Sequence, residues 1–361
     1  MKLLFGADIV PTKESEQLFI EGRVDELFGD VAKLIKNADR TIVNLECALT
    51  KSENTIKKFG PNLKADDKCA DALKKLGVTD VALSNNHIFD FGIEGLKDTT
   101  DALERVGLPY FGIGENDEVS RKPYRIEQDG KKIGIINVCE HEFSYALPDR
   151  IGANPFDPFL TMQDIREVKK TSDYVVVIYH GGKEHVRYPS PRLRNLCREM
   201  VLCGADVVLT QHSHCIGCYE EYEGGHILYG QGNFHFTKSG MRDSWYTGLL
   251  VELDITDKLT IQFIPLTFGN RSIDVPKGEK ADEILNAFAA RNEELKNGDW
   301  KKGWHDFCMS MREVYDGVLR GLYEANSTEE KQQLFAHFLD CEAHTDVWRE
   351  LNPTYNMTNE K

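Results

Sequence analysis

Two amides and an imidazole, Asn85-Asn86-His87, directly follow an apolar run at residues 78–83. Asparagine is depleted in strands and favours turns, so a polar turn is one interpretation of this triplet. The other interpretation is that an amide oxygen and an imidazole are presented together to a metal ion or a substrate. Which of the two applies depends on what the other strand ends of the chain carry.

Five more polar clusters follow apolar runs: Gly6-Ala7-Asp8, Asn44-Leu45-Glu46, His180-Gly181-Gly182-Lys183-Glu184, Gln211-His212-Ser213-His214 and Gly230-Gln231-Gly232-Asn233-Phe234. Ligands bind at such strand ends in open α/β sheets. Singly, each cluster has an ordinary explanation, since Asp8 could cap a helix and His180 could be a hydrogen-bonded core histidine. Together they supply the oxygen and imidazole ligands that suit zinc, manganese or iron, and Glu46 could bridge two such ions.

The elements that must position these clusters alternate along the first two thirds of the chain. Apolar, β-branched runs predict strands at residues 3–5, 41–43, 78–83, 110–113, 132–138, 174–179, 207–210, 226–229 and 249–255. Amphipathic stretches predict helices at residues 24–37, 68–76, 96–106, 159–171 and 190–202. This βαβ rhythm indicates sheets covered by helices. The Asp129-Gly130 pair between two strand-like runs predicts an antiparallel hairpin.

The pattern changes after about residue 270. Apolar spacings of three and four predict helices at residues 280–296, 300–323, 327–339 and 341–351. Asn326-Ser327-Thr328-Glu329-Glu330 resembles a helix N-cap with carboxylates in the first turn, and residues 356–361 are expected to fray. We therefore expect a domain at residues 1–270 and a helical C-terminal extension at residues 271–361.

Composition narrows the class of protein. The chain has 361 residues, 41% of them hydrophobic, and a formal net charge of −15. Such a negative charge argues against sequence-independent nucleic-acid binding. An anionic ligand of any kind would need local positive charge from a metal or arginines. Nine scattered cysteines indicate reduced thiols in a cytoplasmic protein. The first ten residues are interpreted as a strand and not a signal peptide, and no membrane segment is expected; the oligomeric state is not predicted.

The ordered clusters resemble the metallophosphatase-like (calcineurin-like phosphoesterase) superfamily, and within it the CapA family of capsule or poly-γ-glutamate synthesis proteins. The resemblance covers residues 1–255. It rests on Asn44-Leu45-Glu46, on Asn85-Asn86-His87 with Asp90 and Gly92, and on the stretches HGGKEH, GADVVLTQHSH and LYGQGN at residues 180–185, 204–214 and 228–233. It implies an α/β (α+β) four-layer metallophosphoesterase-like sandwich, with sheets flanked by helices and a helical C-terminal appendage.

The resemblance also implies a role for each matching residue. One divalent ion would be held by Asp8, Glu46 and His214, and a second by Glu46, Asn86, His180 and His212. His87 would donate a proton to the leaving oxygen or stabilise the transition state, while metal-activated water attacks. Two departures stand out, because superfamily phosphatases usually carry an Asp-x-His pair where Ile9 and Val10 follow Asp8, and generally have Asp where this chain has Glu46.

Four residues are candidates for binding substrate. Arg187 or Arg192 could grip a phosphate or carboxylate, and Glu184 could meet a substrate amine or orient a ligand. Asn44 could partly compensate for the missing first-motif histidine. Arg194 and Arg198, in contrast, are expected on a solvated helix face.

Five further histidines and cysteines could in principle bind a metal ion. Cys215 and Cys218 follow His214 directly, which leaves a His/Cys zinc site as an alternative use of this segment. His305, His337 and His344 have no metal-like spacing and are expected to be structural or on the surface.

Two functions remain open from the sequence. The first is a CapA-type metal-dependent hydrolase related to capsule or poly-γ-glutamate biosynthesis, acting on a phosphoester or an amide of a small or polymeric anionic substrate with one or two Zn, Mn or Fe ions. The second is a non-catalytic accessory protein for the synthesis or export of an anionic capsule polymer. The missing first-motif histidine favours the second function, and the complete ligand set with His87 favours the first.

Overall fold

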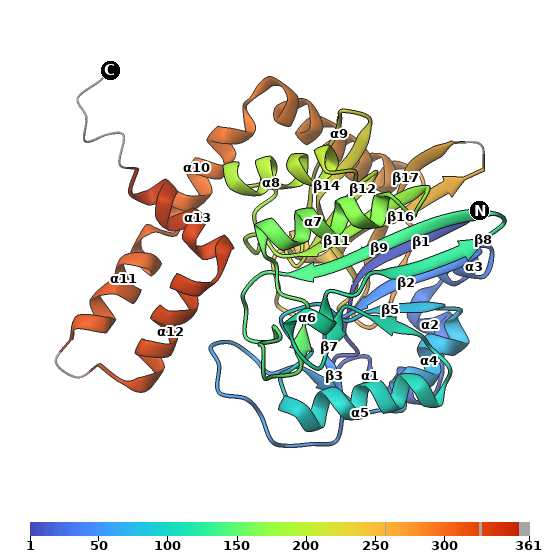
Figure 1. Ribbon diagram of the computed structural model, residues 1–361, viewed down its shortest axis with the longest axis horizontal. Coiled ribbons are helices and arrows are strands. Elements are labelled where there is room, and N and C mark those ends of the chain that lie inside the picture. The colour runs from blue at the N-terminus through green and yellow to red at the C-terminus, as the bar shows by residue number, and fades with distance from the viewer. Residues whose placement is uncertain (257, 325–326, 354–361) are drawn as a thin grey trace.

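A computed structural model describes residues 1–256, 258–324 and 327–353 of the chain (Figure 1). Its first sheet has the strand order β18-β17-β16-β1-β2-β5-β6, with β15 also paired to β1. β1, β2, β5 and β6 run parallel, whereas β16, β17 and β18 are antiparallel to their neighbours. The bounds are β1 Lys2–Ile9, β2 Arg40–Leu45, β5 Asp80–Ala82, β6 Tyr110–Phe111, β15 Asn233–His235, β16 Thr247–Ile255, β17 Leu259–Phe268 and β18 Ile273–Asp274.

The second sheet has the order β13-β14-β12-β11-β9-β8, with antiparallel strands at both edges. The predicted hairpin is confirmed between β8 and β9, where Asp129 and Gly130 take φ values of 53° and 73°. The bounds are β8 Tyr124–Gln128, β9 Lys131–Cys139, β11 Tyr174–His180, β12 Val207–Gln211, β13 Ile216–Tyr222 and β14 Gly225–Gln231. Two short pairs lie outside these sheets, β3 Ala48–Leu49 with β4 Lys64–Ala65 and β7 Ile113–Gly114 with β10 Gly152–Ala153.

The two sheets pack face to face and helices cover their outer faces, which confirms the predicted four-layer α/β sandwich (Figure 1). Alternation along β1 explains the packing, since Leu3 and Phe5 face the second sheet while Leu4 faces the helices. The helices that accompany the first sheet are α1 Glu16–Ile20, α2 Val24–Phe28, α3 Val31–Lys36, α4 Cys69–Leu76 and α5 Gly92–Arg105. α7 Pro158–Lys169 and α8 Pro191–Leu202 cover the second sheet, and α6 Asp117–Ser120 and a 3₁₀ turn at Asp243–Tyr246 lie in connections.

The helix predicted at residues 24–37 is in fact two helices, α2 and α3. Gly29 separates them with a φ of 47°, a conformation that L side chains rarely adopt. A Cβ at this position would also lie 2.7 Å from the carboxylate of Asp274, which accepts the Asp30 N–H at 2.8 Å. The break therefore comes from a tertiary contact with β18, which the local apolar spacing does not reveal.

The C-terminal part is helical, as predicted, with α9 Glu279–Asn297, α10 Trp300–Ser310, α11 Arg312–Tyr323, α12 Glu329–Asp340 and α13 Glu342–Leu351. α9 packs on β13, whereas α10 to α13 share a separate apolar core with Trp304, Tyr315 and Phe338 (Figure 1). The helix predicted at residues 300–323 is interrupted at Met311. The division at residue 270 stays a prediction.

Two predictions at this end touch residues outside the described ranges. The first is the predicted N-cap segment, in which Asn326 lies outside the described residues. Within that segment, the described Thr328 caps α12 by accepting the Lys331 N–H at 3.3 Å. The predicted fraying at residues 356–361 is the other. Within the described ranges, every helix is too short or too polar to cross a lipid bilayer.

Candidate metal centre

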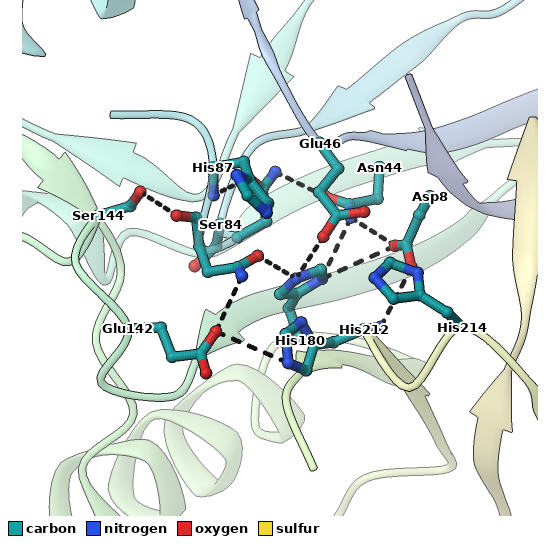
Figure 2. Close-up of polar contacts among 12 residues, drawn as sticks. Asp8, Asn44, Glu46, Ser84, His87, Glu142, Ser144, His180, His212 and His214 are labelled. Carbon is teal, nitrogen blue, oxygen red and sulfur yellow. Dashed lines mark hydrogen bonds and ion pairs between the residues drawn. The ribbon is translucent and has the colours of Figure 1, made fainter. Parts of the chain in front are cut away.

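The carboxyl ends of parallel strands from both sheets meet at one point (Figure 2). Asp8 lies near the end of β1, opposite Asn44 of β2 in register, and His180 ends β11. A register shift between Phe5 and Asp8 bends β1 just before the carboxylate, and such bulges redirect side chains beside functional sites. The topology thus brings together all six predicted metal ligands, namely Asp8, Glu46, Asn86, His180, His212 and His214.

Glu46 occupies the middle of this cluster. It is fully buried, and neither carboxylate oxygen has a hydrogen-bond partner among the described residues. Glu46 belongs to two groups of mutually close ligand atoms, one with Asp8 and His180 and the other with His212 and His214. A buried carboxylate without donors is costly unless a cation neutralises it, so the position of Glu46 fits a bridging metal ligand.

Asn86 and His180 face each other across the cluster. The Asn86 Oδ1 lies 2.9 Å from His180 Nε2, and Glu46 Oε1 lies 3.3 Å from the same nitrogen. Asn44 stands behind them, because its Nδ2 donates to Asp8 Oδ1 at 2.7 Å and lies 3.2 Å from His180 Nδ1. Asn44 therefore positions two candidate ligands, and its amide group is turned toward them and not toward a cavity.

His212 and His214 come from the turn that follows β12. Both take left-handed backbone conformations, with φ values of 83° and 53°, which directs their rings back toward Asp8. The His212 N–H donates to Asp8 Oδ2 at 3.2 Å, while His214 Nδ1 lies 2.8 Å from Asn233 Oδ1 and 3.6 Å from Asp8 Oδ2. Strained non-glycine residues of this kind cluster at functional sites.

Burial controls the protonation of the centre. It raises the pKa of Glu46 to about 8 and, with the nearby Glu46 charge, that of Asp8 to about 7. Burial also lowers the pKa values of His180 and His214 to about 3. The fold thus disfavours charge on these groups. A bound divalent cation would reverse that preference for the carboxylates and would accept the neutral imidazoles as ligands.

His87 lies beside the metal ligands and lines a cavity of about 320 Å³ together with Asn86 and Glu184. Its Nδ1 is 2.7 Å from Asp90 Oδ2 and 3.1 Å from the ammonium group of Lys58, which also pairs with Asp90. Burial and the Lys58 charge lower the pKa of His87. Because Asp90 favours the proton on Nδ1, the Nε2 atom is left for proton exchange.

Sequence reasoning missed two residues that hold this arrangement. Asn85 donates from Nδ2 to Asn44 Oδ1 at 3.0 Å and accepts the His87 N–H at 3.1 Å, so the triplet at residues 85–87 is a turn that also carries the candidate ligand Asn86. Glu142, eight per cent exposed, accepts from Asn86 Nδ2 at 2.8 Å and thereby directs the amide oxygen toward His180. The signal for Glu142 was available, because Glu140-His141-Glu142 follows the strand at residues 131–139.

The arginines expected beside the substrate lie elsewhere. The Arg192 guanidinium donates to Glu140 Oε1 at 2.7 Å and to Asp346 of α13 at 2.9 Å, because α13 folds back onto the start of α8. Arg187 lines a different cavity of about 450 Å³ near Asp243. Glu184 does line the cavity at His87, where it can meet a ligand. Arg194 and Arg198, expected to be solvated, both pair with Glu220.

We expect Arg192→Ala to lower the free energy of unfolding by about 3–5 kcal/mol, because two buried carboxylates lose their shared cation. Arg349→Ala is a matched control. Arg349 lies 3.8 Å from the same Asp346, but its side chain is 72% exposed, so the loss should stay below about 1 kcal/mol. Denaturant unfolding measures both values. Equal, small losses would contradict the structural role of Arg192.

The structure also places the cysteines of the alternative zinc site and the histidines of the C-terminal helices. The Cys215 and Cys218 thiols donate to the carbonyl oxygens of Val186 and Arg187, away from the two histidines of the turn after β12. All nine cysteines are buried and free. Of the three histidines in the C-terminal helices, His305 is exposed and pairs with Glu350 at 2.8 Å, whereas His337 and His344 are buried near Glu142.

Comparison with known proteins adds the family. Residues 2–238 match the family model described as "Bacterial capsule synthesis protein PGA_cap". The chain is 28% identical over 276 residues to the "Capsule biosynthesis protein CapA" of Bacillus anthracis, covering 73% of this chain and 67% of that protein. It is 29% identical over 243 residues to the "PGA biosynthesis protein CapA" of Bacillus subtilis (strain 168), covering 66% and 64%. The chain thus spans about two thirds of the length of these curated relatives.

Among solved structures, a novel phosphatase from Mycoplasma pneumoniae is similar with a TM-score of 0.46 and 17% identity, covering 74% of this chain and 93% of that one. The family model spans well over half of the chain and includes every strand end that contributes to the cluster around Glu46. The chain belongs to the family of bacterial capsule synthesis proteins of the PGA_cap (CapA) type.

Proposed function

We propose that this chain is a divalent-metal-dependent hydrolase that acts on an anionic substrate in capsule polymer metabolism. One observation carries the proposal: Glu46 is buried between two sets of candidate ligands, and neither carboxylate oxygen has a hydrogen bond among the described residues, although Oε1 lies 3.3 Å from His180 Nε2. Such a carboxylate costs free energy in a protein that holds no cation. The burial of Glu46 is explained if its carboxylate binds one divalent ion or bridges two.

The donor set supports zinc, manganese or iron at this centre. We assign Asp8, Glu46 and His214 to one ion and Glu46, Asn86, His180 and His212 to the other, a mixture of carboxylate, amide and imidazole donors that such ions accept. The mutually close ligand atoms group Glu46 with Asp8 and His180 and also with His212 and His214, so the division of the ligands between two ions is part of the proposal. Bound there, divalent ions would lower the pKa of a coordinated water toward about 7 and stabilise charge on the substrate. The residues around the centre orient these donors, with Asn44 holding Asp8 and His180, and Glu142 holding Asn86.

His87 is proposed to transfer a proton to the leaving oxygen or nitrogen. The Asp90 carboxylate holds Nδ1, so Nε2 is the atom that exchanges the proton. His87 and Asn86 line the same cavity, which supports this role, because a substrate held next to the candidate metal ligands would lie within reach of the ring.

The substrate class is inferred from charge and family. Lys58 and Lys183 line the cavity at His87, and a larger cavity of about 630 Å³ shares Lys58, Phe59 and His337 with it and adds Arg150. The larger cavity carries Lys57, Lys58 and Arg150 against Asp340, and this positive excess suits an anion such as a polyglutamate-like chain or a phosphoester. Glu142 and Glu184 offset the two lysines of the smaller cavity. The names of the Bacillus relatives refer to capsule and PGA biosynthesis, which favours the polymer.

A non-catalytic accessory role is the second candidate. Asp8 already accepts hydrogen bonds from Asn44 and from the His212 N–H, and Ile9 and Val10 stand where an imidazole would strengthen the first ion site. Both features favour a first ion site that is weak or empty, so that the chain would bind one ion and not two. A protein with one ion and no turnover could still bind a capsule polymer.

The test is to load the purified chain with Zn, Mn or Fe, count bound ions by elemental analysis, and screen phosphoesters and γ-glutamyl compounds for hydrolysis. Turnover that requires the metal, together with one or two ions per chain at this centre, is the expected result. A chain that binds metal but hydrolyses neither class would favour the accessory role. A chain that binds no metal would contradict both the ligand assignment and the hydrolase.

A further inference from the structure

A second group of potential metal ligands lies where the helical C-terminal part meets the α/β sandwich. Glu142, Cys341 and His344 each place one ligand atom within 4.8 Å of the other two, and all three side chains are buried. Cys341 separates α12 from α13, and His344 lies in the first turn of α13, while Glu142 follows β9 (Figure 1). The group therefore joins residues nearly 200 positions apart in the chain.

The spacing approaches that of a tetrahedral zinc-type site. Zinc bonds to oxygen, nitrogen and sulfur imply ligand-to-ligand distances of about 3.3–3.6 Å. The Cys341 Sγ lies 3.5 Å from Glu142 Oε1, and the Nε2 atom of His337 lies 3.7 Å from the same oxygen. The widest spacing within the group exceeds a tetrahedral edge by no more than about 1.5 Å, which side-chain rotation can close.

The neighbouring side chains hold these groups in the orientation that a metal needs. The Tyr315 hydroxyl lies 2.7 Å from His344 Nδ1, so the other ring nitrogen is free to face Glu142. Metal-bound histidines generally have such a partner on the second nitrogen. Glu142 uses its other oxygen, Oε2, to accept from Asn86, and the same oxygen lies 3.6 Å from His212 Nε2, which leaves Oε1 for the group (Figure 2).

We propose that Glu142, Cys341 and His344 form a metal site for a zinc-type divalent ion, separate from the centre at Glu46, with His337 beside it as a further nitrogen donor. Glu142, His337 and His344 line the same cavity as His87, so the ion would fasten the α12–α13 turn as a wall of that cavity. Cys341, His344 and His337 all lie beyond residue 238, where the family match ends. The site would thus join Glu142, which lies within the family match, to donors from this chain's C-terminal part.

Proton balance is simple. In the metal-free protein the Cys341 thiol donates to Glu142 at 3.5 Å. Binding the ion forms a metal–sulfur bond and releases the thiol proton to solvent, with no change in oxidation state. A hydrogen-bonded cluster that never binds metal is the competing explanation, and the two differ in whether a thiolate–metal bond forms.

Cobalt(II) provides the test, because thiolate-to-cobalt charge transfer absorbs in the near ultraviolet and the centre at Glu46 contains no cysteine. We expect the full chain loaded with Co²⁺ to show this band. Cys341→Ser should abolish it, and His344→Gln, which retains every cysteine, should lower the Co²⁺ affinity measured from the band at least tenfold. Cys215→Ser is the matched control, since its thiol donates to Val186 and should not affect the band.

Three outcomes would overturn the assignment. One is the absence of the band from the Co²⁺-loaded wild-type chain. The second is a band that survives in Cys341→Ser, and the third is a band lost in Cys215→Ser, which would move the thiolate to the turn after β12. Circular dichroism of each variant ensures that only folded protein is compared. If Cys341→Ser does not fold, His344→Gln decides the matter. Because the band does not depend on turnover, these results are independent of the proposed hydrolase.

Discussion

Glu46→Gln is expected to empty the candidate metal centre. Glutamine keeps the volume of the side chain but removes the negative charge that both ligand groups share. Losing a shared ligand should weaken metal binding by more than the roughly 10–100-fold typical of changes behind the ligands. Elemental analysis after dialysis should therefore find little metal at this centre, and hydrolysis should fall with it.

The same variant should have a distinctive effect on stability. Without metal, its free energy of unfolding should equal or exceed that of the wild type, because Glu46 makes no hydrogen bond among the described residues and its buried carboxylate costs free energy when no cation is bound. With metal at 100 times its dissociation constant, the wild type gains about 2.7 kcal/mol, and Glu46→Gln should lose that gain.

Glu220→Gln is the matched control for Glu46→Gln. Glu220 pairs with Arg194 and Arg198 and lies on β13, so its replacement should reduce stability in the presence and absence of metal while leaving metal content unchanged. If Glu46→Gln retained a full complement of metal, the bridging position of Glu46 would be wrong. If it lost stability equally with and without metal, its role would be structural.

His87→Ala is expected to lower the turnover number by about 10²–10⁴ on whichever substrate the screen identifies, since a positioned imidazole that transfers a proton contributes a factor of this size. Metal content should stay near that of the wild type, because His87 is held by Asp90 and Lys58 and not by the metal ligands. Steady-state kinetics and elemental analysis on the same preparation measure both quantities.

The control for His87→Ala is His305→Ala, which removes an imidazole that is about half exposed and pairs with Glu350. Its activity and metal content should match the wild type. Full activity in His87→Ala would exclude this residue from proton transfer. Loss of metal in His87→Ala would instead make the ring a ligand.

Local sequence patterns predicted most strands of the α/β core and the positions of the polar clusters that form the site. Continuous apolar runs predict the central strands because each strand is buried on both faces, one against the other sheet and one against the helices. Polar residues at the ends of those runs predict the cluster, because parallel strands of one sheet end at the same edge. The polar clusters could therefore be located without coordinates, whereas the choice of Asp8, Glu46, Asn86, His180, His212 and His214 as candidate ligands came from the resemblance to the CapA family.

Only the tertiary structure decided what the C-terminal helices do. Their amphipathic spacing predicts helices but does not indicate which surface they cover. The fold brings Asp346 to Arg192, which converts an expected substrate anchor into a buried ion pair. It also brings Cys341 and His344 to Glu142, and gives Glu142 the task of orienting Asn86. Local patterns record the period of an element and the residue types at its ends. Contacts between elements that are 150–200 residues apart depend on how layers pack, and no local pattern encodes them.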